Sequence, residues 1–190
     1  MLGQSSVNPP ARNVALPRVT LILGGARSGK SRHGEAMIER ATTGGIYLAT
    51  ATVGDAEMAE RVARHRERRG PHWTTIEEPL EIASRLRAAS RPVLVDCLTL
   101  WLANLLHAGR DPAGEGEILL AALATMPMPA VLVANEVGLG IVPENALARS
   151  FRDQAGLLHQ RIAAQADRVV LMAAGLPLTL KDTVAAETSL

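Results

Sequence analysis

Residues 19–31 read VTLILGGARSGKS, a short apolar run followed at once by a glycine-rich loop. The run is rich in aliphatic and β-branched residues, which is typical of a strand buried on both faces of a sheet. The loop satisfies the pattern G-x-x-x-x-G-K-[ST] between a predicted strand and a predicted helix, the context in which that pattern binds nucleotide phosphates. We therefore predict a phosphate-binding loop made of Gly24, Gly25, Ala26, Arg27, Ser28, Gly29, Lys30 and Ser31.

Each residue type in this loop has a chemical task. Glycines let the backbone turn tightly and direct successive N–H groups at phosphate oxygens, and the N-terminus of the following helix adds positive charge. We expect Lys30 to contact the β- and γ-phosphates of ATP or GTP and Ser31 to bind Mg²⁺. Lys30 and Lys181 are the only lysines of the chain, so an accidental match to the pattern is rare.

Four further apolar runs alternate with segments long enough for helices. The predicted strands cover residues 19–23, 46–50, 93–97, 130–134 and 169–173, and the predicted helices cover residues 31–41, 55–69, 80–89, 98–108, 115–125 and 144–166. This alternation indicates an α/β fold, a P-loop NTPase-like, mainly parallel sheet with helices on both faces. We expect one domain over residues 18–190, preceded by a flexible extension over residues 1–17, which is rich in residues that favour disorder.

Composition excludes some classes of partner. Lys and Arg number 20 against 19 Asp and Glu, and the net charge of +1 gives no broad attraction to nucleic acid or to an anionic membrane. Large aromatic residues that could stack on bases are few, with two Trp, one Tyr and one Phe. Pro127 and Pro129 interrupt the longest uncharged segment, so we expect no membrane insertion.

Cys97 is the single cysteine, which excludes an intramolecular disulfide framework and agrees with a reducing, cytoplasmic compartment. We interpret it as a small buried hydrophobic residue.

Polar residues follow two of the predicted strands. Asp96 ends the run VLVD, where a carboxylate is costly unless it faces a ligand or an ion. It is therefore a candidate second anchor for Mg²⁺, and the alternative is a helix N-cap for the segment that begins near Leu98. Asn135 and Glu136 follow the run at 130–134 and either shape the substrate pocket or cap the loop before Pro143.

Residues 55–69, DAEMAERVARHRERR, carry five arginines and one histidine. On a helix, His65 falls on the same side as Met58 and Val62, apart from the solvated arginines. One interpretation is a surface helix with mixed charges, and the other is a segment that handles phosphate groups. His33 is a second candidate nucleophile, although a residue in the helix after the loop more often caps or packs. His72 and Trp73 are interpreted as a strand that enters the sheet.

Six blocks together resemble the family of bifunctional adenosylcobinamide kinase / adenosylcobinamide-phosphate guanylyltransferases of cobalamin biosynthesis. They are GGARSGKSRHGE (24–35), IYLATA (46–51), DAEMAERVARHRERR (55–69), HWTTIEEP (72–79), VLVDCLTLWLANLL (93–106) and NEVGLGIVPENALARSFRDQAG (135–156). The resemblance covers essentially residues 18–181, and the last block is the most specific to the family.

The resemblance implies two reactions. The terminal phosphate of ATP or GTP is transferred to the aminopropanol hydroxyl of adenosylcobinamide, and GMP is then transferred from GTP to the new phosphate, giving adenosylcobinamide-GDP and pyrophosphate. It also implies a guanylylated histidine, matched by His65, and a homotrimer with sites near subunit boundaries. The implied guanine nucleotide contacts, in addition to the phosphate-binding loop, are Ala49, Thr50, Ala51, Arg66, Glu67, Arg68, Arg69, Glu77 and Asp96.

The chain departs from the family pattern at three places. His159 stands before Gln160 where the family usually has Asn, and Asp96 stands where Glu is often found. Arg64 precedes His65 where some members have two adjacent histidines, so His65 is the only histidine of that segment.

Two other functions are open at this point: a single-activity P-loop small-molecule kinase that does not guanylylate His65, and a nucleotide-responsive regulatory protein. The absence of an N-K-x-D motif disfavours an ordinary GTPase switch.

Overall fold

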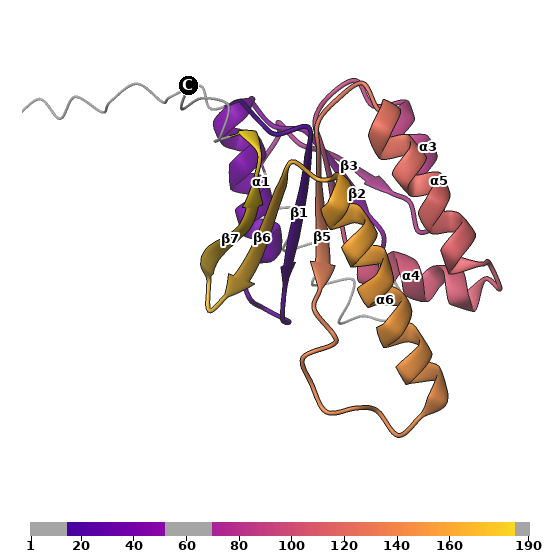
Figure 1. The fold of residues 1–190 in the computed structure, drawn as a ribbon. Coiled ribbons are helices and arrows are strands. Elements are labelled where there is room, and N and C mark those ends of the chain that lie inside the picture. Colours follow the sequence, from indigo (N-terminus) through magenta and orange to yellow (C-terminus); the bar gives the residue numbers. More distant parts are fainter. Residues whose placement is uncertain (1–14, 52–69, 185–190) are drawn as a thin grey trace, which may run out of the picture.

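The computed structural model describes residues 15–51 and 70–184, which build a seven-stranded sheet with helices on both faces (Figure 1). The strands are β1 (Val19–Gly24), β2 (Ile46–Ala49), β3 (Thr74–Glu77), β4 (Val93–Asp96), β5 (Ala130–Asn135), β6 (Arg168–Ala173) and β7 (Leu176–Asp182). Their order across the sheet is β3-β2-β4-β5-β1-β6-β7, and all pairs are parallel except β6 with β7. The predicted mainly parallel α/β sheet is therefore confirmed.

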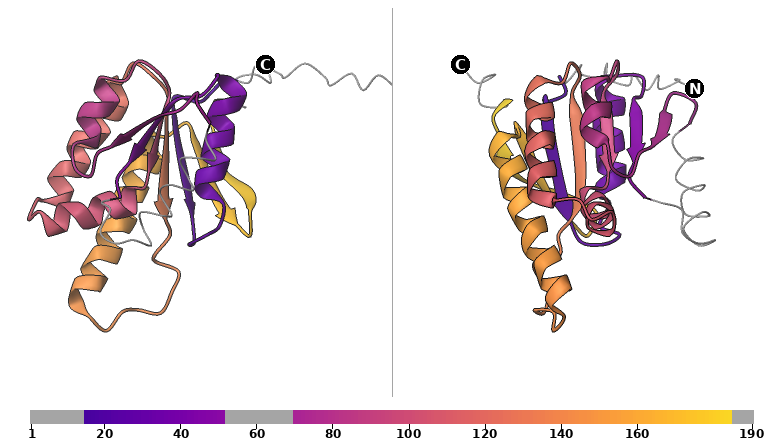
Figure 2. Two further views of the ribbon diagram at one scale, coloured as in Figure 1. Left: turned by 180° about the vertical axis from the view of Figure 1, so that it is seen from behind. Right: turned by 90° about the vertical axis from the view of Figure 1, so that its right-hand side faces the viewer.

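The described helices divide between the two faces of the sheet (Figure 2). They are α1 (Lys30–Ala41), α3 (Ile82–Arg87), α4 (Leu98–His107), α5 (Pro112–Thr125) and α6 (Ala146–Gln165). Helix α1 contacts β1, β4 and β5 on one face, whereas α4, α5 and α6 contact one another on the other face, where α3 packs against α5. The predicted helix at 55–69 and most of the predicted extension, residues 1–14, lie outside the described residues.

The core explains why the central strands are mainly apolar. Leu21 and Ile22 are both fully buried although their side chains point to opposite faces of β1. Ile22 packs in a cluster with Ile38 of α1, and Leu21 packs in a second cluster with Ile162 of α6. Because both faces are covered, β1 shows no alternation of apolar and polar residues.

The edges of the sheet and the ends of the helices differ from the sequence predictions. The strand expected to begin at His72 and Trp73 begins at Thr74, and β7 was not predicted. Helix α5 begins at Pro112 because Asp111 caps it, accepting hydrogen bonds from the N–H groups of Ala113 at 3.1 Å and Gly114 at 3.0 Å. Helix α6 begins after Asn145, which caps it in the same way.

Candidate functional site

The phosphate-binding loop joins β1 to α1 and needs glycine at both of its ends. Gly24 has a φ of +152°, and a Cβ atom there would lie 2.5 Å from the carbonyl oxygen of Met172. Gly29, with a φ of +95°, precedes α1, and no side chain caps the helix at this end. The N–H groups of the first turn are therefore directed at the space that the loop encloses, which suits an anion.

Lys30 is held inside this loop. Its Nζ atom donates a hydrogen bond to the carbonyl oxygen of Gly25 at 2.6 Å, and only 6% of the residue is exposed. Burial lowers the pKa of the Lys30 ammonium, while the nearby Cys97 and Asp96 act in the opposite direction. The Lys30 ammonium is buried with one close carbonyl partner. A charged phosphate group that replaces this contact would therefore stabilise the buried positive charge more strongly.

Asp96 ends β4, and its carboxylate is oriented by a tyrosine. The hydroxyl of Tyr47 donates to Oδ2 of Asp96 at 2.5 Å. The alternative that Asp96 caps the following helix is wrong, because Cys97 occupies the N-cap position of α4 and no side chain caps that helix. Tyr47 was not predicted as part of the site, since its hydroxyl and Asp96 lie 49 residues apart in the chain.

Asp96 and Ser31 suit a magnesium site of the kind that nucleotides complete. Within residues 15–51 and 70–184, no group of three or more His, Cys, Asp or Glu side chains is arranged to hold a metal ion. Mg²⁺ bound with a nucleotide does not require such a group, because it takes one or two protein oxygens together with phosphate oxygens and waters. The half-buried carboxylate of Asp96, close enough to Lys30 to raise the pKa of its ammonium, and the hydroxyl of Ser31 at the start of α1 offer those oxygens.

Two other predicted positions, Ala49 and Glu77, lie in one row with Asp96 at the carboxyl edge of the sheet. In the strand register Ala49 pairs with Glu77 on one side and with Asp96 on the other. Thr50 is fully buried, and its Oγ1 accepts from the N–H of Cys97 and donates to the carbonyl oxygen of Cys97, each at 2.8 Å. Ala49 and Thr50 are thus held in place beside Asp96 and Cys97. Glu77 is exposed at the end of β3, the edge strand.

His65 and Arg66, Glu67, Arg68 and Arg69 lie outside the described residues. His33, the competing histidine, is half-buried in the first turn of α1. Its pKa is lowered by burial and by the positive charges of Arg40 and Arg168.

Two predicted structural roles are confirmed. Cys97 is a buried free thiol whose pKa is raised by burial. Trp73 is buried against Tyr47, with ring centroids 6.5 Å apart and an interplanar angle of 78°, and its Nε1 donates to Oε1 of Glu39 at 2.9 Å.

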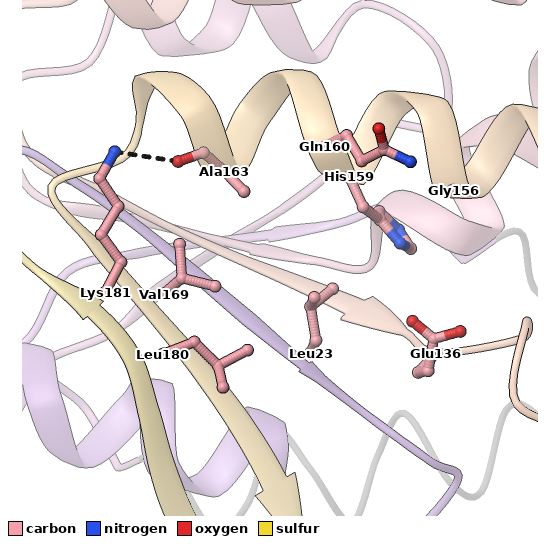
Figure 3. A pocket seen from close by; sticks show the side chains of 9 residues that line it. All are labelled: Leu23, Glu136, Gly156, His159, Gln160, Ala163, Val169, Leu180 and Lys181. Atoms are coloured by element: carbon pink, nitrogen blue, oxygen red, sulfur yellow. Dashed lines mark hydrogen bonds between the residues drawn. The ribbon is translucent and has the colours of Figure 1, made fainter.

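A cavity of about 430 Å³ lies between α6 and the strands β1, β6 and β7. Figure 3 shows that Glu136 and His159 both point into it, from the end of β5 and from α6. Burial lowers the pKa of the His159 imidazole, while the neighbouring Glu136 carboxylate raises it. Glu136 also fulfils the predicted loop-capping role, since its Oε1 accepts from the N–H of Gly138 at 2.5 Å.

The loop, the parallel sheet and the carboxylate at its carboxyl edge define a P-loop nucleotide-binding protein. Solved structures agree at the level of the fold: the flagellar accessory protein FlaH from Methanocaldococcus jannaschii matches with a TM-score of 0.54 at 13% identity, covering 90% of this chain and 82% of that one. An ATPase from the type III secretion system of pathogenic bacteria matches with a TM-score of 0.52 at 13% identity, covering 90% and 58% of the two chains.

Residues 20–180 match the family model described as cobinamide kinase / cobinamide phosphate guanyltransferase, and the chain belongs to that family. The bifunctional adenosylcobalamin biosynthesis protein CobP of Pseudomonas aeruginosa is 52% identical over 167 residues, which cover 85% of this chain and 96% of the relative. The bifunctional adenosylcobalamin biosynthesis protein CobU of Salmonella typhimurium is 43% identical over 179 residues, covering 85% and 98%. Both curated relatives therefore match over nearly their whole length.

Proposed function

We propose that this chain phosphorylates adenosylcobinamide with ATP or GTP and then transfers GMP from GTP to adenosylcobinamide phosphate. The membership of the family over residues 20–180 carries this proposal, and the intact phosphate-binding loop supports it. In the first step the substrate hydroxyl oxygen bonds to the γ-phosphorus and the bond from that phosphorus to the β-phosphate oxygen breaks. The loop N–H groups and Lys30 stabilise charge on the phosphate oxygens, which is most of what phosphoryl transfer requires.

The second step is proposed to pass through His65. A neutral imidazole nitrogen attacks the α-phosphorus of GTP, pyrophosphate leaves, and a phosphate oxygen of the cobinamide phosphate then displaces the histidine. Arg66, Arg68 and Arg69 are proposed to hold phosphoryl oxygens, because a guanidinium group stays charged and can bind two oxygens at once. Ala49, Thr50, Ala51, Glu67, Glu77 and Asp96 are proposed to complete the guanine nucleotide site.

Mg²⁺ is the proposed cofactor, with Ser31 and Asp96 as its protein ligands. When bound, the ion neutralises charge on the nucleotide phosphates. The hydrogen bond from Tyr47 leaves Oδ1 of Asp96 for the ion or for one of its waters. Asp96 is one methylene shorter than the Glu often found in the family, which favours contact through a water.

We propose a homotrimer that acts in the cytoplasm. Several exposed large apolar side chains are grouped on the edge strand β7 and in the loop before α6, and subunit contacts would cover such surfaces. They are Leu176 and Leu178 on β7, and Leu139, Ile141 and Val142 in the loop. Among the described residues, no helix has the length and apolar character needed to cross a membrane.

The test of the two activities uses GTP labelled in its α-phosphate. The proposed route predicts label on the protein that is stable to alkali and lost in acid, as expected for a phosphorus–nitrogen bond, and His65→Ala should abolish it while phosphorylation of cobinamide continues. An active kinase that never becomes labelled would instead be the single-activity kinase. Nucleotide binding without transfer to cobinamide would identify a regulatory protein.

The two lysines of the chain supply a matched pair of variants for the kinase step. Lys30→Ala should lower kcat for phosphorylation by about 10²–10³-fold, the usual cost of removing one preorganised charge-stabilising donor. Lys181→Ala removes the same charge from a side chain that bonds the carbonyl oxygens of Ala163 and Ala164 at the end of α6. Lys181 also lines the cavity beside α6, but its ammonium is engaged by these carbonyl oxygens, so at saturating substrate kcat should stay within about twofold of wild type. Equal activity of both variants would overturn the role of the loop.

A further inference from the structure

Carboxylates stand at the carboxyl ends of three strands, on the sheet edge where the nucleotide is proposed to bind. Among the described residues, Glu77 ends β3, Asp96 ends β4, and Glu136 follows β5. In the strand order, β5 is the one of these three strands that adjoins β1, the strand that leads into the phosphate-binding loop. The N–H of Glu136 donates to the carbonyl oxygen of Gly24 at 3.0 Å, so its backbone is joined directly to the first residue of the loop.

One oxygen of the Glu136 carboxylate is placed so that it can accept a proton from a substrate. Its Oε1 accepts from the N–H of Gly138 at 2.5 Å, which holds the carboxylate in place. Its Oε2 makes no hydrogen bond within the described part of the chain, and the carboxylate points into the cavity beside α6 (Figure 3). Asp96, by contrast, already binds the Tyr47 hydroxyl and faces the proposed magnesium site.

The cavity gives a substrate arm a way to reach this carboxylate. Its volume of about 430 Å³ is enough for a short amide-linked chain but not for a corrin macrocycle. Leu23, which directly precedes the loop, forms part of one wall, and His159 and Gln160 of α6 form part of the opposite wall. His159 is only 6% exposed, and burial lowers the pKa of its imidazole, so near neutral pH it gives Glu136 a neutral neighbour rather than an ion-pair partner.

We propose that the arm carrying the acceptor hydroxyl enters the cavity beside α6 and that Glu136 is the base that takes the hydroxyl proton in the kinase step. This inference rests on the proposed function. The hydroxyl oxygen bonds to the γ-phosphorus, its proton passes to Oε2 of Glu136, and the nucleoside diphosphate leaves with the electron pair of the broken phosphorus–oxygen bond. Glu136 then returns the proton to solvent.

The test separates the kinase step from the guanylyl transfer step. In Glu136→Gln the amide keeps an oxygen for the N–H of Gly138 but cannot accept the proton. At saturating adenosylcobinamide and ATP, kcat for phosphorylation should fall by about 10²–10⁴-fold. The KM for ATP, the labelling of the protein by GTP and the transfer of GMP to supplied adenosylcobinamide phosphate should all remain within about threefold of wild type.

Glu144→Gln is the matched control, because it removes the same charge from an exposed position of the same loop. It should leave every rate unchanged. A second measurement distinguishes a base from a residue that only shapes the loop: in Glu136→Ala, added formate should restore part of the lost kinase rate in proportion to its concentration, which a purely structural defect would not allow. Kinase activity of Glu136→Gln within about threefold of wild type, or equal losses in both steps, would overturn the assignment.

Variants of α6 test whether the substrate arm enters the cavity. Ala163 lines the cavity, and the next residue, Ala164, is exposed on the helix surface. Ala163→Leu should raise the KM for adenosylcobinamide at least about tenfold and leave the KM for ATP unchanged, whereas Ala164→Leu should change neither. Equal KM values in the two variants would exclude the cavity as the entry route. A wild-type protein that does not phosphorylate adenosylcobinamide at all would contradict the proposed function itself, which keeps the two failures distinct.

Discussion

The hydroxyl of Tyr47 on β2 donates a hydrogen bond to Oδ2 of Asp96 on β4, with the two oxygens 2.5 Å apart. The strands are neighbours, and the tyrosine ring is itself held edge-on against Trp73. A short hydrogen bond to an ionised carboxylate is among the stronger polar interactions of a folded protein. Tyr47 therefore sets the direction in which Asp96 can bind an ion.

Tyr47→Phe removes this hydrogen bond and keeps the ring. We expect the free energy of unfolding to fall by about 1–3 kcal/mol, because a partly buried carboxylate loses a donor. The Mg²⁺ concentration that gives half-maximal kinase activity should rise several-fold, since the carboxylate is no longer oriented. Urea denaturation and a Mg²⁺ titration measure the two effects. An unchanged Mg²⁺ requirement would show that Tyr47 supports the fold and not the ion.

Gly24 and Gly25 are adjacent but differ in the space around them. A Cβ atom at Gly24 would lie 2.5 Å from the carbonyl oxygen of Met172 and 2.8 Å from Oγ of Ser28, and the φ of +152° disfavours other residues. We expect Gly24→Ala to destabilise the protein by at least about 2 kcal/mol and to weaken nucleotide binding.

Gly25→Ala is its control, since nothing lies within 4 Å of the added atom. The control should keep the stability of wild type. Thermal unfolding with and without ATP compares the two variants, and similar losses of stability in both would contradict the steric explanation.

His159 should make stability depend on pH. Its folded-state pKa is lowered from the ordinary value of 6.5 by burial, so as pH falls through that value the unfolded state takes up the proton first. The free energy of unfolding should therefore decrease as pH falls from about 7.5 to 5.5, by at most about 1.4 kcal/mol per pH unit for one group.

His159→Asn restores the residue usual in the family and should reduce this dependence. Part of the slope should remain, because burial and two arginines also lower the pKa of His33. Urea denaturation of both proteins at three pH values across this interval measures the difference. Identical slopes of the free energy of unfolding against pH in the two proteins would show that the pKa of His159 does not change on folding.

The exposed leucines of β7 give a test of the proposed homotrimer. Leu178 is 57% exposed on the edge strand, and Leu157 is 60% exposed on α6. If the protein is the proposed trimer of three 20.1 kDa chains and β7 forms a subunit contact, Leu178→Lys should give smaller species than wild type. Leu157→Lys adds the same charge outside that strand and should leave the trimer intact. Analytical ultracentrifugation reads the mass directly, and an intact trimer in the β7 variant would exclude this strand from the interface.

The central strands and the phosphate-binding loop were predictable from sequence because local chemistry determines them. A strand covered on both faces must be mainly apolar, as β1, β4 and β5 are before their carboxyl ends, and a loop that encloses phosphate needs glycine where φ is positive. The edge strands were harder to predict from the sequence. Within the described part of the chain β6 alone pairs with β7, which contains Pro177, and neither the composition nor the period of such an edge strand is distinctive.

The amino-acid sequence alone thus determined the α/β class, the loop with its Lys30 and the candidate carboxylate Asp96, since each depends on residues that are close in the chain. The tertiary structure decided the strand order that puts β5 beside β1, the pairing of Tyr47 with Asp96, and the approach of Glu136 to the phosphate-binding loop. Residues far apart in the chain make these contacts. They depend on how whole strands and helices pack, and side-chain packing between distant segments leaves no local pattern in sequence.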